Sequence, residues 1–203
     1  MMIRRLVRVV LIAWILSAAA ACGVTAPSHF YMLDATATPG GAPAADYAVA
    51  VGPVTVPAAV DRPQFVVQAG PNRVELDEYH RWAAPLEDSI ARVIAVDLSA
   101  LLGTPRVARA PLANFDPAYL VTIDVLRFES APGRSALVDA VWAIRPMAGG
   151  ASRSGRTVAQ EPAQGAGYDA LAAAHSRALA KLSEDIAAAI RAEAAAGTAA
   201  QTP

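Results

Sequence analysis

Histidine, acidic and serine side chains are the first candidates for chemistry in this sequence, but their spacing favours no catalytic site. His29, His80 and His175 share no metal-ligand spacing, and His175 lies on the apolar stripe of a predicted helix. Neither a G-x-S-x-G elbow nor a Gly-rich phosphate loop occurs. Three pairs of adjacent acids point to different sides of an element: Asp77-Glu78, Glu87-Asp88 and Glu184-Asp185. We therefore expect no enzyme, no metal site and no nucleotide cofactor.

Cys22 is the only cysteine, and the residues before it form a targeting signal. Basic residues (Arg4, Arg5 and Arg8) precede an apolar run over 9–16 and small residues over 17–21, the pattern of a secretory signal peptide. The stretch 9–21 is too short to span a bilayer, which needs about 20 apolar residues. Small residues directly before a cysteine resemble the lipobox of bacterial lipoproteins, although Ala19 replaces the usual Leu.

That resemblance implies cleavage after Ala21 and lipidation of Cys22 by a diacylglycerol and an N-acyl chain, the only added groups expected. Several acyl chains give stable anchoring. Gly23 follows the cysteine where an inner-membrane retention signal usually has Asp, which favours the outer membrane. The alternative is an ordinary signal peptide that leaves a free thiol.

Length and charge restrict the remaining classes. The 203 residues suggest one domain, and one cysteine excludes an internal disulfide framework. Loss of residues 1–21 removes three arginines and leaves 14 basic against 18 acidic residues, a net charge of −4. A mildly acidic chain has no broad positive surface for phosphates, so nucleic-acid binding is not expected.

Alternating apolar residues predict most of the strands, and turn residues separate them. Gly52-Pro53 is expected to be a bulge or bend inside its strand. Apolar spacing predicts one helix from Pro85 to just before Gly103 and another from about Tyr168 to Ala194. The predicted strands cover 29–33, 47–56, 64–68, 73–76, 106–108, 119–129, 137–145 and 152–160.

This order predicts an α+β fold (an α/β sandwich), with one mainly antiparallel or mixed sheet and two helices packed on one face. The chain divides into a signal peptide (1–21), a lipidated tether (22–28), a single domain (29–194) and a flexible tail (195–203). The segment 35–46, rich in Pro, Gly and Ala, is expected to be a loop.

Three side chains are candidates for contact with a partner. Arg62 precedes Pro63, which biases it to an extended conformation at a strand entry. Arg81 and Trp82 lie before Pro85 at a helix entry, where Trp82 can staple the helix to the sheet. The alternative is that all three only support the fold.

Several of these segments together resemble the ABC-type transport auxiliary lipoproteins, also called PqiC-like lipoproteins. The resemblance spans about 29–190 and is carried by Phe30-Tyr31-Met32-Leu33, Gly52-Pro53-Val54, Asp61-Arg62-Pro63-Gln64 and Arg81-Trp82-Ala83-Ala84-Pro85-Leu86.

The resemblance implies a non-enzymatic, lipid-anchored periplasmic subunit of an intermembrane lipid transport system. The implied partners are a protein with an MCE domain, its permease and the membrane itself, and the subunit would form a homo-oligomeric ring in one arrangement. It would dock the transporter at a membrane, the outer one rather than the inner, and support envelope integrity.

Two other readings stay open at this stage. A tethered hydrolase would need Ser89 or Ser135 to act as nucleophile without an evident base. A structural lipoprotein would bridge the membrane and peptidoglycan. The lipid cargo, transport direction and oligomer size do not follow from the sequence.

Overall fold

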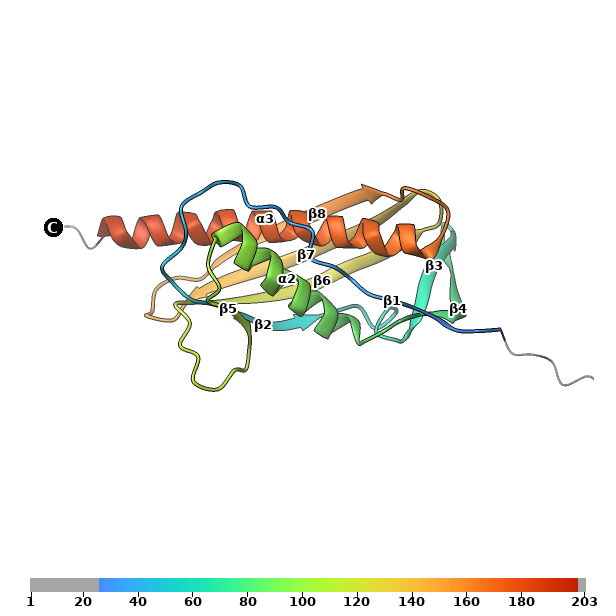
Figure 1. Cartoon of the computed structure of the whole chain (residues 1–203), viewed down its shortest axis with the longest axis horizontal. Coiled ribbons are helices and arrows are strands. Elements are labelled where there is room, and N and C mark those ends of the chain that lie inside the picture. Colours follow the sequence, from blue (N-terminus) through green and yellow to red (C-terminus); the bar gives the residue numbers. More distant parts are fainter. Residues whose placement is uncertain (1–25, 201–203) are drawn as a thin grey trace, which may run out of the picture.

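The computed structural model describes residues 26–200, which form two sheets and two helices (Figure 1). The α+β class and both helices are therefore confirmed, while the strands form two sheets instead of the single sheet expected. In chain order the elements are β1 (His29–Tyr31), β2 (Val49–Thr55), β3 (Gln64–Gly70), β4 (Arg73–Trp82), α2 (Leu86–Leu102), β5 (Val107–Arg109), β6 (Tyr119–Ala131), β7 (Ser135–Pro146), β8 (Arg153–Pro162) and α3 (Tyr168–Ala200).

The larger sheet has the strand order β5-β2-β6-β7-β8. Strand β2 pairs in parallel with β5 and β6, and the β6–β7 and β7–β8 pairs are antiparallel. The β2–β6 register shifts between Val51 and Val54, which confirms the bulge predicted at Gly52-Pro53. A side chain at Gly52 would meet the end of the Leu120 side chain and lie tightly against the Val121 carbonyl, so glycine suits this close approach of the strands.

Alternation along β7 sorts its residues between the two faces of the sheet, as the sequence predicts. Val138, Ala140, Trp142 and Ile144 are all buried on the face that the helices cover. Val141 is 37% exposed on the other face. A period of two is the geometric property of a strand, and it places every second side chain in the core.

The smaller sheet has the order β1-β4-β3, with β1 parallel and β3 antiparallel to β4. Strand β4 runs to Trp82, although the sequence predicts a strand only over 73–76. The segment after Leu76 is polar and lacks alternation, so only its pairing with strands on both sides reveals it. His29, Phe30 and Tyr31 pair with three consecutive residues of β4, beginning at His80.

Both helices pack on the same face of the larger sheet, α2 against β2 and β5, and α3 against β7 and β8. Gly103 ends α2 in the left-handed conformation with φ of 65°, as predicted for a C-terminal glycine. Helix α3 continues to Ala200, past the end predicted at Ala194 and into the segment predicted to be a flexible tail. Alanine has the highest helix propensity, and this stretch is rich in alanine.

A loop that we call the strap (residues 34–46) crosses the two helices. Its Asp34 N–H donates to Ser176 Oγ of α3 at 3.0 Å, and its Ala37 N–H donates to Asp97 Oδ1 of α2 at 3.0 Å. The Asp97 side chain is buried, and burial raises its pKa despite these hydrogen bonds. The strap therefore follows the predicted loop but is held in place by hydrogen bonds.

The described part of the molecule is elongated, with β1 toward one end of the long axis and the last turns of α3 at the other (Figure 1). We call the end formed by β1, β3, β4 and the start of α3 the tether end, because the chain enters β1 there from the segment predicted to be the tether. The far end is formed by the end of α3 and the loops beside β5. One hydrophobic core runs through both sheets and both helices.

Candidate partner-binding surface

The structure brings together the segments that carry Arg62, Arg81 and Trp82, although Arg62 lies on the loop before β3 and the other two residues lie at the end of β4. The Trp82 N–H donates to the Pro63 carbonyl at 2.7 Å, which joins the loop before β3 to the end of β4. The two segments line an open pocket of about 340 Å³, whose wall includes Arg62, Trp82 and Pro85. Arg81 lies next to Trp82 on β4, outside that lining.

Arg62 and Arg81 differ in how free their charges are. Across residues 26–200, the exposed Arg62 guanidinium has no hydrogen-bond or ion-pair partner. Arg81 donates from Nε to the Glu78 carbonyl at 2.8 Å and forms an ion pair with the Glu78 carboxylate at 3.2 Å. Arg62 can therefore meet an anionic group of a partner without first breaking an ion pair, whereas Arg81 is partly neutralised.

Trp82 is a core residue with only 6% of its surface exposed. Its indole stacks on Phe65 with ring centroids 4.2 Å apart and meets Phe128 edge-to-face at 6.0 Å. These contacts join β4 to β3 and β6. The expected role of Trp82, stapling the helix after Pro85 to the sheet, stays a prediction. A direct contact between Trp82 and a partner stays a prediction.

A cluster of rings and one carboxylate ties the tether end together, and sequence reasoning missed it. The His80 ring stacks on Tyr168 at 4.0 Å, and its Nδ1 is hydrogen-bonded to the Tyr31 hydroxyl. The Tyr168 hydroxyl donates to Asp77 Oδ2 at 2.8 Å. Burial and this carboxylate raise the pKa of Tyr168. Because Asp77 and Tyr168 are 91 positions apart, no local sequence pattern predicts their hydrogen bond.

The Asp77 carboxylate is held in its charged form. Burial favours its protonation, but the Tyr168 hydroxyl and the N–H groups of Tyr79 and His80 donate to the carboxylate. The net effect is a lowered pKa. The cluster joins β1, β4 and the first turn of α3, so it positions the strand that follows the tether.

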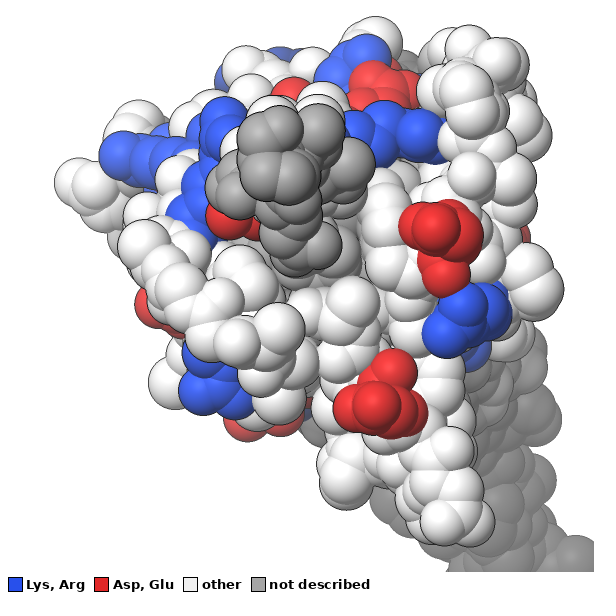
Figure 2. Space-filling model, turned by 90° about the vertical axis from the view of Figure 1, so that its left-hand side faces the viewer, with Lys and Arg blue, Asp and Glu red and all other residues white. Residues whose placement is uncertain are grey.

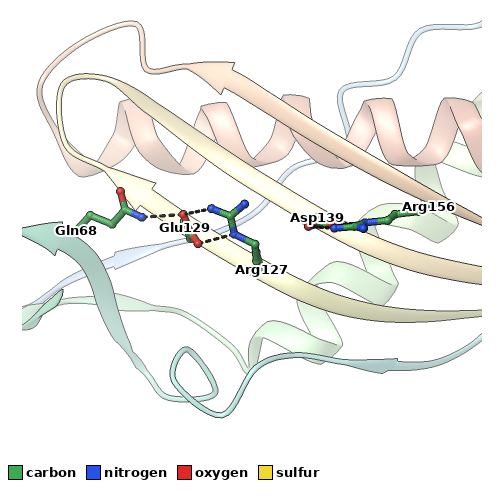
Figure 3. Close-up of polar contacts among 5 residues, drawn as sticks. All are labelled: Gln68, Arg127, Glu129, Asp139 and Arg156. Atoms are coloured by element: carbon green, nitrogen blue, oxygen red, sulfur yellow. Dashed lines mark hydrogen bonds and ion pairs between the residues drawn. The ribbon is translucent and has the colours of Figure 1, made fainter. Parts of the chain in front are cut away.

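The face of the larger sheet opposite the helices carries two arginine–carboxylate pairs (Figure 3). Arg127 donates to both oxygens of Glu129, at 2.7 and 2.9 Å, and Gln68 Nε2 of β3 donates to the same carboxylate at 2.7 Å. Arg156 pairs with both oxygens of Asp139 at 2.8 and 2.7 Å.

In the second pair, Arg156 covers the Asp139 carboxylate on a face that no helix covers. The Asp139 side chain is 3% exposed and lies beside Arg156, which is 58% exposed. The hydrogen bonds from Arg156 lower the pKa of Asp139 against the effect of burial. Large apolar side chains lie exposed on the same face, namely Leu126, Val141 and Val158.

One serine and one histidine meet in the core at the distance of a nucleophile and its base. Ser130 Oγ and His175 Nε2 are 2.8 Å apart, yet the serine is 2% exposed and the histidine is fully buried. Burial lowers the pKa of His175 to about 3, and Nδ1 has no hydrogen-bond partner. A base this weak, without an orienting group or access for substrate, is part of the core packing.

The predicted lipidation site, Cys22, lies outside the described residues. Among residues 26–200, neither helix has the length and apolar character required to cross a bilayer. The far end of the molecule shows small separate groups of both signs with uncharged surface between them (Figure 2).

Two solved structures share this fold, each at 20% sequence identity. One is a crystal structure of an uncharacterised protein, with a TM-score of 0.68 over 81% of this chain and 99% of that chain. The other is protein XCC0632 from Xanthomonas campestris, with a TM-score of 0.67 over 79% of this chain and 93% of that chain. A PelC dodecamer from Paraburkholderia phytofirmans is similar only at a TM-score of 0.38, with 15% identity over 72% of this chain and 85% of that chain.

No curated protein matches the sequence. The family model described as "ABC-type transport auxiliary lipoprotein component" matches residues 31–187, which include both helices to within a few turns of the end of α3 and all strands but the first residues of β1. This match confirms the resemblance found in the sequence motifs. The chain belongs to the ABC-type transport auxiliary lipoprotein family.

Proposed function

We propose that this protein is a membrane-anchored periplasmic lipoprotein subunit of an MCE-type, ABC-linked intermembrane lipid transport system. In this role it docks the transporter at a membrane and so supports envelope integrity. The family match over residues 31–187 carries the proposal. The signal and lone cysteine directly before the domain support it, because they supply the anchor that a docking subunit needs.

The shape of the domain suits a docking role. Acyl chains on Cys22 hold the tether end near the bilayer and leave the far end to extend into the periplasm. Anchoring raises the effective concentration of the domain for any partner at the same membrane. A homo-oligomeric ring of such domains would multiply the contacts with a ring-shaped MCE partner. Gly23 favours the outer membrane as the site of anchoring.

The proposed partner surface contains Arg62 and Arg81 beside the pocket at the end of β4. Arg62 offers an unpaired cation, and the pocket offers an apolar wall formed by Pro63, Trp82 and Pro85. An acidic or amphipathic segment of the MCE protein fits this combination. We infer a non-enzymatic role from the family match. The Ser130–His175 pair supports this inference, because it is sealed inside the core and offers no nucleophile to a substrate.

Copurification from gently solubilised envelopes tests the partner and the surface together. We expect tagged full-length protein to recover an MCE protein, and Arg62→Ala with Arg81→Ala to reduce that recovery while the melting temperature stays unchanged. Arg145→Ala is the matched control, because Arg145 is exposed on β7 near the far end. Recovery of peptidoglycan-bound proteins alone would favour a structural lipoprotein that bridges membrane and cell wall.

The anchor is tested by Cys22→Ser. We expect this variant to lose acylation and to move from the membrane fraction to the soluble periplasmic fraction, because the acyl chains on Cys22 are the proposed anchor. Mass spectrometry of the N-terminal peptide and fractionation measure the two effects. Cys22→Ser protein that remains in the membrane fraction would show that another attachment suffices.

A further inference from the structure

Two large apolar side chains lie exposed directly after the tether, one in β1 and one at the residue that follows it. Phe30 is 64% exposed and Met32 is 60% exposed. The alternate residues turn inward, since Tyr31 is half-buried in the aromatic cluster and Leu33 is fully buried. The alternation of the strand therefore directs one pair of side chains into the core and the other pair to the outside.

No described residue covers these two side chains. They flank a shallow groove between β1 and the start of α3, together with Asp34 and Asp169. Phe30 also pairs in register with Arg81, whose charge is partly neutralised by Glu78. Arg92 also lies close by, since its guanidinium donates to the Leu33 carbonyl. Carboxylates and arginines are therefore mixed around the two side chains, and the apolar groups supply the attraction to a neutral lipid surface.

The length of the tether indicates that the bilayer surface lies within reach of Phe30 and Met32. Residues 22–28 span at most about 25 Å when fully extended, so an anchor at Cys22 keeps β1 within that distance of the bilayer surface. Helix α3 has 33 residues, which corresponds to about 50 Å, and it runs from beside β1 to the far end. Only the tether end is thus obliged to stay near the lipid.

We propose that Phe30 and Met32 insert into the interfacial region of the bilayer and set the anchored domain on its tether end. This inference rests on the proposed lipid anchor at Cys22. Apolar side chains gain free energy by leaving water, and the anchor has already brought them to the surface. Helix α3 then points away from the membrane, which carries the far end about 50 Å into the periplasm.

The lone cysteine allows a test that does not depend on acylation in the cell. The mature chain, beginning at Cys22, is coupled through its thiol to vesicles of phosphatidylcholine that contain a maleimide-headgroup lipid. Tryptophan is introduced as Met32→Trp or, as the matched control, Met147→Trp. Met147 is 47% exposed, and its N–H bonds to the Ala118 carbonyl at the far end. The native Trp82 and Trp142 are buried and give the same background in both proteins.

We expect phosphatidylcholine with brominated acyl chains to quench the emission of Met32→Trp and to leave that of Met147→Trp unchanged. The quenching should persist at high salt, because apolar contact is not screened. Adding Phe30→Ser should reduce it, while the melting temperature remains that of the parent protein.

Three results would overturn the proposal. Quenching of neither reporter would mean that the tether end does not touch lipid and that Phe30 and Met32 serve a protein partner. Equal quenching of both would mean that the domain lies flat, and quenching unaffected by Phe30→Ser would remove Phe30 from the contact. The proposed function fails separately, if Cys22 is not acylated in cells or no MCE protein copurifies.

Discussion

The buried His175 predicts a loss of stability at mildly acidic pH. Burial lowers the pKa of this histidine from 6.5 to about 3, and the side chains that contact it are Ser130, Phe128 and Trp82, none of which carries a charge. Below pH 6.5 the unfolded chain binds a proton at this position, whereas the folded chain does not bind it until about pH 3. Proton binding therefore stabilises the unfolded state relative to the folded state as pH falls through this window, and the free energy of unfolding decreases.

The size of the effect follows from the two pKa values. Between pH 7 and pH 5, protonation of one unfolded histidine lowers the free energy of unfolding by about 2 kcal/mol. The comparison uses Ser130→Ala and the double variant Ser130→Ala with His175→Phe, both in the Cys22→Ser background. The phenyl ring keeps a planar group against Phe128, which stacks on His175 at 3.8 Å, and the alanine avoids an unpaired hydroxyl.

Urea unfolding at pH 7, 6 and 5, followed by tryptophan fluorescence, measures the difference. We expect the chain with His175 to lose about 2 kcal/mol more than the double variant over this range. Contributions from other groups, including the raised pKa of Asp97, are common to both chains and cancel. Identical pH dependence of the two chains would refute the argument that His175 is buried without charge.

Two further substitutions test the core. Trp82→Ala should lower the free energy of unfolding by about 3 kcal/mol, since it removes the ring stacked on Phe65, and an unchanged urea midpoint would mean that the indole is exposed in solution. Gly155→Ala should cost about 1–3 kcal/mol, because a methyl group there overlaps the Trp142 ring, whereas Gly167→Ala meets no atom within 4 Å and is the control. Equal melting temperatures for the two glycine variants would contradict the close packing of β7 against β8.

Much of the fold could be predicted because strands and helices leave periodic patterns. The alternation over 119–129 and 137–145 locates β6 and β7 and sorts their faces, and Gly103 marks the end of α2. The continuation of β4 to Trp82 could not be predicted, because its polar residues are stabilised by partner strands from both sides. The helical run past Ala194 was missed since alanine without large apolar residues gives no stripe.

The candidate surface also has features that the sequence predicts and features that only the tertiary structure shows. Arg62 and Arg81 were identified from motifs, but they are neighbours because β3 pairs with β4 and the Trp82 N–H donates to the Pro63 carbonyl. The aromatic cluster, the Ser130–His175 pair and the Gln68–Glu129 contact join residues that lie 45 or more positions apart. Such contacts depend on how the elements pack against one another. The spacing of residues along the sequence therefore does not predict them.

The sequence by itself determined the local properties of this protein, namely the positions of most strands and helices, their buried faces and the family, and it predicts a targeting signal before Cys22. Tertiary structure alone decided that the strands divide between two sheets, that the strap is bonded across both helices, and that Phe30 and Met32 are left outside at the tether end. The physical reason is the distance along the chain over which each property is set. Periodicity arises from neighbouring residues within one element. Sheet partition and exposure depend on contacts between segments that are distant in the chain.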